Sequence, residues 1–288
     1  MADAIIIDGK SIAEGYLAKI KQEVEGLPTP PCLAMVLVGE NPASLLYVRY
    51  KQKHAESLGI TSLLYMLPAE ASEAELLHLV NDLNQNPQID GVLVQLPLPE
   101  HIDEFKVISA IRPDKDVDGF TTENIGLLAL KKDCLVPCTP LGCIKLLKSV
   151  EKDISGLNAV VVGRSNIVGR PLAQMLLNEN CTVTVTHSHT KDLPDICVKA
   201  DILAVAVGNP GMVKGNWIKP GAIVLDVGIS YMPDKSIRGD VDFAEALKVA
   251  KAITPVPKGV GPMTKAMLMH NTVKAYKKRR GWHDAQPD

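Results

Sequence analysis

Tyr47 and Lys51 form the first pair of side chains whose types and spacing suit catalysis. They are four residues apart in a segment with a helical pattern, so both would lie on one face of a helix. An aromatic ring can stack on a planar ligand, and a lysine amine can accept a proton once burial or a neighbouring cation favours its neutral form. The same pair also suits a solvated helix surface, and the spacing alone does not separate the two interpretations.

Gln95 and Asp118 are two further polar residues that could take part in a ligand site. Gln95 ends the apolar run 91–95, which predicts a strand, and open α/β sheets bind ligands at the carboxyl ends of their strands. Asp118 lies in a turn rich in carboxylates, residues 115–120. Their positions are also consistent with a polar strand end facing water and with a capped surface loop.

A glycine-bearing turn after the apolar run 159–162 predicts a nucleotide site. It reads G-x-S-x-x-x-G-x-P from Gly163 to Pro171, between a predicted strand and a predicted helix. Glycines let the backbone approach a pyrophosphate, and a helix N-terminus offers free N–H donors to an anion. The pattern is not G-x-G-x-x-G, and such a turn can also be a plain connection.

The end of the following predicted strand favours NADP over NAD. NAD enzymes usually place a carboxylate on the ribose about 20 residues after the glycine turn. This chain has no carboxylate in that segment before Asp192. Arg164 and Ser188, with His189 or Lys191, could hold a 2′-phosphate instead. The two histidines of the segment are interpreted as a polar strand end, because no third metal ligand is evident, and no metal site is predicted.

A parallel α/β framework is predicted to position these side chains, because strand-like runs alternate with helical patterns along the chain. Residues 112–138 are interpreted as loop-rich, and the basic run 277–280 as a solvated end of the last helix. Strands are predicted at residues 34–38, 63–67, 91–95, 159–162, 182–186, 202–207 and 222–227. Helices are predicted from Asn41-Pro42 to Gly59, from a capping box at Ser72 and Glu75 to residue 84, after Thr139-Pro140, and over residues 262–278.

Composition supports two ordinary α/β domains in 288 residues, 46% of which are hydrophobic. A net charge of -2 argues against broad electrostatic binding of nucleic acid, and no apolar run is long enough for a membrane span. The first ten residues lack the features of a signal peptide, so we expect a cytoplasmic protein with reduced thiols. Cys134, Cys138 and Cys143 do not match a zinc pattern and are expected to be buried. The expected partners are small molecules and another copy of the chain, and neither nucleic acid nor a membrane.

Several stretches together resemble the bifunctional methylenetetrahydrofolate dehydrogenase/cyclohydrolase family. They occur in the family's order and cover essentially the whole chain. They are residues 47–51, 91–99, 115–120, 137–140, 163–171 and 254–264.

The resemblance implies roles for the residues that match the family's motifs. Lys51 matches the catalytic lysine, Tyr47 the tyrosine that stacks on the pterin, and Gln95 the glutamine beside the lysine. Asp118 matches the aspartate that accepts hydrogen bonds from the pterin ring. Tyr47, Gln95 and Asp118 also match substrate-binding residues of the family. Further matches to the substrate site are Gly261 and Pro262, and to the NADP site Gly163, Arg164, Ser165, Ser188 and Ile229.

The resemblance also implies two α/β domains and a homodimer formed through the nucleotide domains. The folate-binding catalytic domain would comprise residues 1–138 plus 270–288, and a Rossmann-like NADP-binding domain with a parallel sheet would comprise residues 139–269. The implied activity is NADP-dependent oxidation of 5,10-methylenetetrahydrofolate to 5,10-methenyltetrahydrofolate, followed by hydrolysis to 10-formyltetrahydrofolate.

The chain departs from the family at Lys258, where a glycine is usual, and at Lys265, where an apolar residue is usual. Lys258 could touch the glutamate tail of the folate or point to solvent, and solvent is the favoured interpretation. Two other functions remain to be compared: a Rossmann dehydrogenase for a shikimate-like or amino-acid substrate, and a nucleotide-binding regulatory protein without activity. The dehydrogenase would not require Lys51, Gln95 and Asp118 to converge, and the presence of every catalytic position argues against the regulatory protein.

Overall fold

The computed structural model describes residues 3–282, except for the side chains of Pro42 and Ala43. The chain forms two compact units, and each is built from two separate segments. The six-stranded unit comprises Met1–Gly15 and Pro137–Met267, and the three-stranded unit comprises Tyr16–Val136 and Leu268–Asp288. Helices α1 (Gly9–Glu25) and α10 (Val260–Arg279) each contribute residues to both units.

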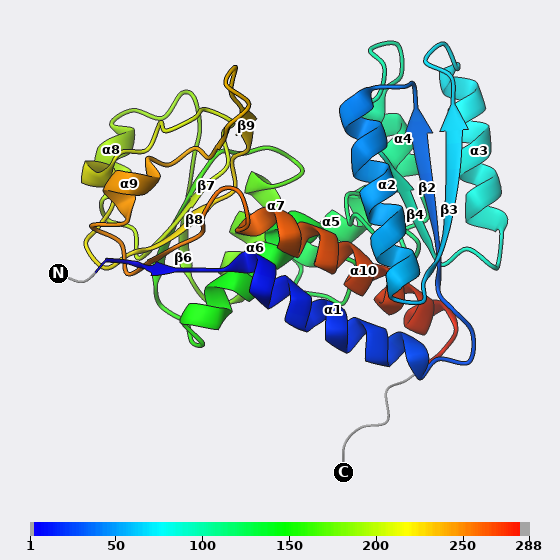
Figure 1. The fold of residues 1–288 in the computed structure, drawn as a ribbon, viewed down its shortest axis with the longest axis horizontal. Helices are drawn as coiled ribbons and strands as arrows, with labels where there is room; N and C mark the ends of the chain where they lie inside the picture. The colour runs from blue at the N-terminus through cyan, green and yellow to red at the C-terminus, as the bar shows by residue number, and fades with distance from the viewer. Residues whose placement is uncertain (1–2, 283–288) are drawn as a thin grey trace. The chain divides into compact units, whose positions relative to one another are not determined.

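The three-stranded unit is built on a parallel sheet with strand order β3-β2-β4 (Figure 1). The central strand is buried along its whole length, as expected of a strand covered on both faces. Its alternate residues, from Cys32 to Val38, pack with the apolar sides of α3 and α4. The elements are β2 (Cys32–Val38), α2 (Pro42–Ser57), β3 (Thr61–Leu67), α3 (Glu73–Gln85), β4 (Gly91–Val94) and α4 (Glu104–Ala110).

Local signals in the sequence set the ends of these elements. The predicted capping box at α3 is confirmed: the Ser72 side chain accepts from the backbone N–H of Glu75, and the Glu75 side chain accepts from that of Ser72. Gly59 follows α2 with φ of +80°, a conformation that favours glycine at a helix end. The interpretation of residues 112–138 as loop-rich missed helix α5 (Thr122–Ala129), which is capped by Thr121.

The six-stranded unit contains a parallel sheet with strand order β1-β11-β8-β7-β5-β6. The predicted fold class, two α/β domains of which one is Rossmann-like with a parallel sheet, is confirmed. The chain passes from β5 to β6 and then back across β5 to β7, so the order reverses between β5 and β7. The strands are β1 (Ile5–Ile6), β5 (Asn158–Val162), β6 (Thr182–Thr186), β7 (Ile202–Val205), β8 (Ile223–Asp226) and β11 (Ala252–Ile253).

Short helices and an antiparallel hairpin complete this unit. Its apolar core includes Val160, Leu203 and Val224 from three neighbouring strands. The helix predicted after Thr139-Pro140 begins earlier than expected, because α6 starts at Cys138. The Thr139 hydroxyl bonds that of Thr264, 3.0 Å away. The remaining elements are α6 (Cys138–Val150), α7 (Gly169–Asn178), α8 (Leu193–Cys197), η1 (Gly215–Trp217), β9 (Ser230–Tyr231), β10 (Ile237–Arg238) and α9 (Phe243–Ala246).

The observed division of the chain differs from the expected one chiefly at the N-terminus. Residues 1–15 belong to the six-stranded unit, because β1 pairs with β11 through Ile5 and Ile6. These partners are far apart in the sequence, and β1 is only two residues long, so no local pattern predicts the pairing.

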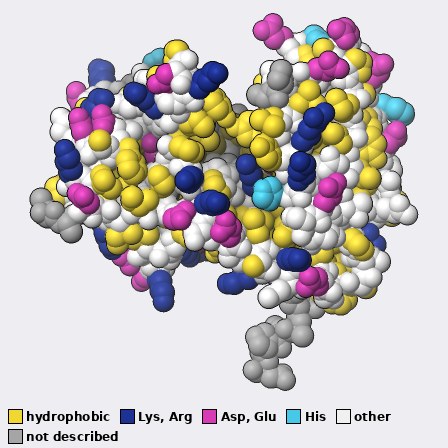
Figure 2. Space-filling view, in the orientation of Figure 1, with side chains coloured by type: hydrophobic (Ala, Val, Ile, Leu, Met, Phe, Trp, Pro, Cys, Tyr) yellow, Lys and Arg dark blue, Asp and Glu magenta, His cyan; other side chains and the backbone are white. Residues whose placement is uncertain are grey.

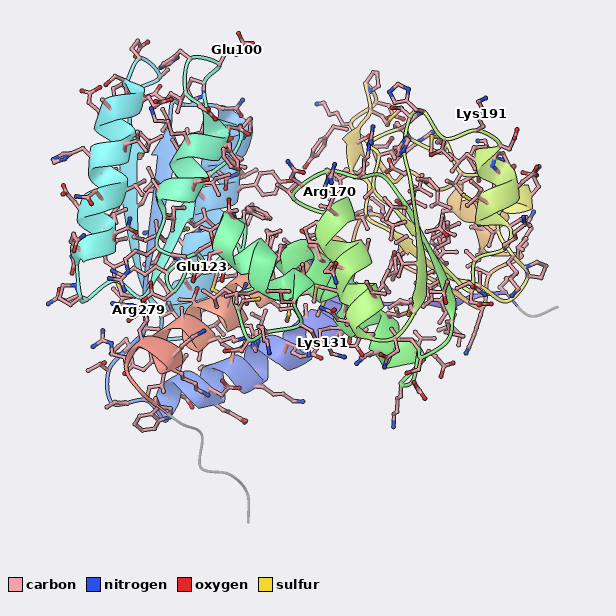
Figure 3. The ribbon with its side chains drawn as sticks, turned by 180° about the vertical axis from the view of Figure 1, so that it is seen from behind. Glu100, Glu123, Lys131, Arg170, Lys191 and Arg279 are labelled. Atoms are coloured by element: carbon pink, nitrogen blue, oxygen red, sulfur yellow. The ribbon has the colours of Figure 1, made fainter. Side chains whose placement is uncertain are left out.

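The basic end of α10 is not simply solvated, contrary to the expectation from sequence. Arg279, which is labelled in Figure 3, lies near the end of α10. Its side chain is 13% exposed and pairs with the fully buried carboxylate of Asp90 at 2.9 Å. Arg280 approaches the same carboxylate at 3.3 Å, and Lys277, 15% exposed, pairs with Glu23. These ion pairs fix the last turns of α10 within the three-stranded unit.

The remaining expectations on composition concern thiols and surface charge. All six cysteines are free and buried, which confirms the interpretation of Cys134, Cys138 and Cys143. On the face shown in Figure 2, basic and acidic side chains are intermixed. No helix within residues 3–282 is both long and apolar enough to cross a membrane.

Candidate active site

Lys51 and Gln95 meet in the three-stranded unit, although 44 residues separate them in the sequence. The Lys51 Nζ donates to Gln95 Oε1 at 3.0 Å, and the Gln95 Nε2 donates to the carbonyl of Leu96 at 2.6 Å. Gln95 therefore has its amide orientation fixed by two contacts, with its oxygen towards the amine. Tyr47 lies one helical turn before Lys51 on α2 and is 38% exposed. The spacing of Tyr47 and Lys51 thus places both on one helix face, as predicted.

The position of Gln95 follows from the topology of the sheet. Strand β2 leads through α2 to β3 on one side, and β3 leads through α3 to β4 on the other side of β2. Ligands of open α/β sheets bind at the carboxyl ends of strands where the order reverses in this way. Gln95 directly follows β4, and its N–H donates to the carbonyl of Val36 on β2 at 2.8 Å. It therefore stands at the reversal point.

Asp118 is held by a turn that is anchored from both sides. Asp116, 1% exposed, accepts from the N–H groups of Gly119 at 2.9 Å and Thr121 at 2.7 Å. Lys115 is fully buried, and its Nζ donates to three carbonyls at the end of α3, those of Leu83, Asn84 and Asn86. Burial, and then the charges of Arg279 and Arg112, lower the pKa of Lys115 to about 8.

Asp118 and Leu96 line one small hollow, together with Phe120 and residues of β4 and α4. Because the Gln95 side chain bonds to the Leu96 carbonyl, this hollow links the Asp118 turn to the strand end that carries Gln95. The structure thus brings Lys51, Gln95 and the Asp118 turn to one edge of the sheet. Tyr47 belongs to the same helix as Lys51.

The reversal point of the six-stranded sheet carries the glycine turn. Gly163 follows β5 with φ of +115°, and a Cβ atom at this position would lie 2.3 Å from the carbonyl oxygen of Ala206, which follows β7. Gly169 is equally restricted, because its Cβ would lie 2.2 Å from the carbonyl oxygen of Gly163. The two glycines therefore allow a tight turn at the place where Rossmann folds bind a dinucleotide.

Ser165 bonds to backbone N–H groups within the glycine turn and at the start of α7. Its Oγ accepts from the N–H groups of Val168 at 3.2 Å and Gly169 at 3.3 Å, and its carbonyl accepts from Arg170 at 3.0 Å. The expectation that the first N–H groups of α7 are free for a phosphate is therefore wrong for Gly169 and Arg170. Arg164 is exposed, and its carbonyl accepts from the Arg170 Nε at 3.2 Å.

The segment after β6 places polar groups near Arg164. Ser188 and His189 are exposed, and the N–H of His189 donates to His187 Nδ1 at 3.2 Å. Burial, and then the charge of Arg164, lower the pKa of His187, which indicates that this cation lies close to the imidazole. Lys191 stands just before α8 (Figure 3). Within residues 3–282, no group of three or more histidine, cysteine or carboxylate side chains is arranged to hold a metal ion.

Ile229 and Gly261 are neighbours within the six-stranded unit. Ile229 follows β8 and is 47% exposed, and a Cβ added to Gly261 would lie 3.9 Å from its side chain. Gly261 and Pro262 form the first turn of α10. The preceding Lys258 is exposed, as the sequence interpretation favoured, but its φ of +82° lies in the left-handed region. A lysine therefore occupies a conformation that favours glycine.

Comparison with known proteins decides the family. Residues 7–118 match the catalytic domain of tetrahydrofolate dehydrogenase/cyclohydrolase, and residues 137–280 match the NAD(P)-binding domain of the same family. The chain belongs to the tetrahydrofolate dehydrogenase/cyclohydrolase family. The activities expected from the sequence are confirmed at this level: the chain is a methylenetetrahydrofolate dehydrogenase and methenyltetrahydrofolate cyclohydrolase with an NAD(P)-binding domain.

Individual relatives agree over nearly the whole length of this tetrahydrofolate dehydrogenase/cyclohydrolase. The bifunctional protein FolD of Wolbachia sp. subsp. Drosophila simulans (strain wRi) is 54% identical over 276 residues, which cover 94% of each chain. The FolD structure from Campylobacter jejuni is 47% identical, with a TM-score of 0.94, and the match covers 96% of this chain and 99% of that one. The Trypanosoma brucei enzyme, in complex with NADP and an inhibitor, is 39% identical with a TM-score of 0.91 and the same coverage.

Several buried charged residues of this tetrahydrofolate dehydrogenase/cyclohydrolase escaped the sequence interpretation. Lys115 and Asp116 support the Asp118 turn, and Asp226 and Asp240 lie fully or almost fully buried in the six-stranded unit. The available signal was weak: Asp226 ends an apolar run, and Asp240 follows a glycine in a segment that resembles an ordinary turn. Their role depends on long-range contacts that spacing does not reveal.

Proposed function

We propose that Lys51, Gln95, Tyr47 and Asp118 form the folate site and that the six-stranded unit binds NADP. The observation that carries the proposal is the 3.0 Å hydrogen bond from Lys51 Nζ to Gln95 Oε1 at the reversal point of the three-stranded sheet. In this arrangement Tyr47 stacks on the pterin and Asp118 accepts hydrogen bonds from it. Gly261 and Pro262, in the first turn of α10, keep the substrate-binding assignment that their match to the family's motif implies. The residues assigned to NADP are Gly163, Arg164, Ser165, Ser188 and Ile229.

The oxidation step depends on positioning. Hydride leaves the methylene carbon between two amine nitrogens, whose lone pairs stabilise the resulting cation, so no base is required. NADP, which Gly163, Arg164, Ser165, Ser188 and Ile229 would hold, would supply the hydride acceptor for this step. Tyr47 and Asp118 fix the plane and the direction of the pterin, and thereby the orientation of the carbon that reacts.

The hydrolysis step needs a proton acceptor. Water adds to the methenyl carbon, its proton passes to the neutral amine of Lys51, and the carbon–nitrogen bond at N5 breaks as N5 takes up a proton. The product is 10-formyltetrahydrofolate. A protonated Lys51 would repel the methenyl cation by about 4 kcal/mol at ~4 Å and an effective dielectric near 20, so the neutral amine is favoured in this complex. Gln95 orients that amine.

The Lys51→Met variant tests these roles, because methionine keeps most of the stem length and removes the base. Hydrolysis of methenyltetrahydrofolate, followed by its absorbance, should collapse, whereas hydride transfer should decline less. A variant that hydrolyses methenyltetrahydrofolate at the parent rate would show that the role is misassigned. So would a variant whose NADP binding falls as much as its hydrolysis.

The preference for NADP rests on Arg164 and Ser188, because the segment after β6, where NAD enzymes usually carry a carboxylate, has none before Asp192. Arg164 is exposed and close enough to His187 to lower the pKa of that imidazole. Arg164→Ala should weaken binding of NADP much more than binding of NAD, because it removes a charge-assisted contact to the 2′-phosphate. A clear preference of the parent enzyme for NAD in steady-state kinetics would contradict the assignment.

We also propose a homodimer formed through the six-stranded units. Strand β6 lies at the edge of the sheet, and Val185 on this strand is 40% exposed. An exposed edge strand can pair with another chain. Light scattering at micromolar concentration should give the mass of two chains, and Val185→Lys should lower it. A single-chain mass for the parent protein would refute the dimer.

A further inference from the structure

Two buried carboxylates lie beneath the carboxyl edge of the six-stranded sheet, outside the residues assigned above. Asp226 is 2% exposed and ends β8, and Asp240 is 0% exposed and follows β10. A buried carboxylate loses the hydration that stabilises its charge, so each must be compensated by hydrogen bonds. The partners of both residues are backbone N–H groups of the turns at this edge.

Asp240 binds the turn that follows β7. Its Oδ2 accepts from the N–H of Val207 at 2.7 Å and from that of Gly208 at 2.9 Å. This turn begins at Ala206, whose carbonyl is the atom against which Gly163 packs. Asp240 therefore supports, through one intervening turn, the glycine turn at the reversal point of the sheet.

Asp226 binds the segment that carries Asp240 and the turn that follows β8. Its Oδ1 accepts from the N–H of Asp240 at 2.9 Å and of Gly228 at 3.2 Å, and its Oδ2 accepts from that of Val241 at 3.0 Å. Gly228 precedes Ile229, one of the residues assigned to the cofactor site. The two carboxylates thus connect the turns after β7 and β8 to a single segment.

Two glycines are required by this arrangement. A Cβ on Gly228 would lie 2.1 Å from the Cγ of Asp240, and a Cβ on Gly239 would lie 1.9 Å from the Oδ2 of Asp226. Each carboxylate therefore packs directly against the backbone of a glycine. The second oxygen of Asp240, Oδ1, is buried without a hydrogen-bond partner among the described residues. A buried polar atom without a partner destabilises the fold, which argues that Asp240 has a role beyond packing.

The backbone of the Asp240 segment is fixed independently of its side chain. The carbonyl of Gly239 accepts from Gly211 at 2.9 Å, and the carbonyl of Asp240 accepts from Val213 at 3.0 Å. The Asp240 side chain is therefore presented to the turn after β7 from a rigid support, which is what a group that positions a binding loop requires.

We propose that Asp240 is a positioning residue for the dinucleotide: through its hydrogen bonds to Val207 and Gly208 it holds the turn after β7 in the shape that receives the cofactor. Asp226 anchors Asp240 and adds the turn after β8 to the same framework. The inference rests on the proposed location of the NADP site at this edge. It adds two acidic residues that support the site from below without touching the cofactor.

The test compares Asp240→Ala with Asp240→Asn. Alanine removes both hydrogen bonds, whereas asparagine keeps an oxygen that can accept both N–H groups in a side chain of the same shape. The KM for NADP should rise at least tenfold in Asp240→Ala and stay within threefold of the parent in Asp240→Asn. Hydrolysis of methenyltetrahydrofolate, supplied directly and without NADP, should remain within twofold of the parent in both variants. Asp242→Ala is the matched control, because Asp242 lies two residues away, caps the exposed start of α9 and should not change the KM for NADP.

Each other outcome overturns the proposal. An unchanged KM for NADP in Asp240→Ala would show that the turn does not need the carboxylate. Equal loss of both activities in the two variants would indicate a general structural role, and equal KM increases in the two variants would exclude the hydrogen bonds as the cause. Arg164→Ala separates this failure from that of the cofactor assignment: if Arg164→Ala weakens NADP binding and Asp240→Ala does not, only the positioning role is wrong.

Discussion

Gln95→Glu changes the charge beside Lys51 with almost no change in shape. In the parent enzyme an amide oxygen accepts from the amine at 3.0 Å, and this contact does not depend on whether the amine is charged. A carboxylate in the same place strongly favours the ammonium form. Because the proposed hydrolysis uses the neutral amine, Gln95→Glu should suppress the cyclohydrolase at neutral pH and restore it at higher pH.

The size of the effect follows from the distance and the exposure of the pair. Two opposite charges ~3 Å apart attract by about 1.4 kcal/mol in water and by about 5 kcal/mol at an effective dielectric of 20. Lys51 and Gln95 are both partly exposed, so solvent screening places the value towards the lower limit. An attraction of about 2 kcal/mol corresponds to roughly 1.5 pH units, because one unit is about 1.4 kcal/mol. The pH at which hydrolysis reaches half its maximal rate should rise by about that amount.

The assay follows the absorbance of methenyltetrahydrofolate at saturating concentration over a series of pH values, with the spontaneous reaction subtracted. Gln88→Glu is the matched control, because it adds the same charge to an exposed position just before β4, at the opposite end of the strand from Gln95. Its pH profile should not move. A Gln95→Glu profile that coincides with the parent profile would refute the role of a neutral Lys51, and so would a shift towards lower pH.

Three further predictions concern stability. Lys258→Gly should raise the free energy of unfolding by about 1 kcal/mol in urea titrations, because it relieves the strain of a lysine in the left-handed backbone conformation. The turnover of monoglutamyl folate should stay unchanged. A lower unfolding midpoint or a large change in maximal rate would contradict this prediction. Arg279→Ala should cost about 3 kcal/mol, because it removes the shorter ion pair of the buried Asp90 and leaves this carboxylate with the Cys32 N–H at 2.9 Å and the longer contact to Arg280. Lys278→Ala, which removes an exposed ion pair, should cost less than about 1 kcal/mol, and equal losses in the two variants would refute the argument. Burial, with the charge of Asp240 as a smaller cause, raises the pKa of Asp226 from 3.8 to about 7, so between these values the folded protein holds a proton that the unfolded chain has lost. Raising the pH from 5 to 7 should therefore destabilise the parent relative to Asp226→Asn by about 2 kcal/mol, and a difference that stays constant or changes sign would show that Asp226 titrates elsewhere.

The sequence predicted most strands because their apolar runs are short, continuous and bounded by turn residues. The run at 182–186 coincides with β6, and the runs that became β2, β5 and β8 differ from those strands by one or two residues at an end. Helix α5 was missed because it follows a turn crowded with carboxylates and is only eight residues long. Strand β1 was missed because its partner β11 comes from the far end of the chain.

The candidate site was predictable in its residue types and less so in its supports. Lys51, Gln95 and Asp118 were identified through motif resemblance. Local patterns also indicated the helix face of Lys51, the strand end of Gln95 and the turn that carries Asp118. The supports are different, because they act through space: Lys115 binds the end of α3, about thirty residues earlier in the chain, and Asp240 binds a turn that precedes it by 32 residues. A single sequence carries no periodic signal for such contacts.

Helix α10 has a consequence for the order in which the newly synthesised chain can fold. Its second half belongs to the three-stranded unit, where the Asn271 amide donates to the carbonyls of Val117 and Val136, both at 2.8 Å. The Tyr276 hydroxyl also bonds that of Thr29 at 2.9 Å. Domains generally fold during synthesis from the N-terminus onwards. Here the unit that holds residues 16–136 receives its last helix only after all of the six-stranded unit has been translated, so this earlier-made unit stays incomplete until residues 268–279 have been synthesised.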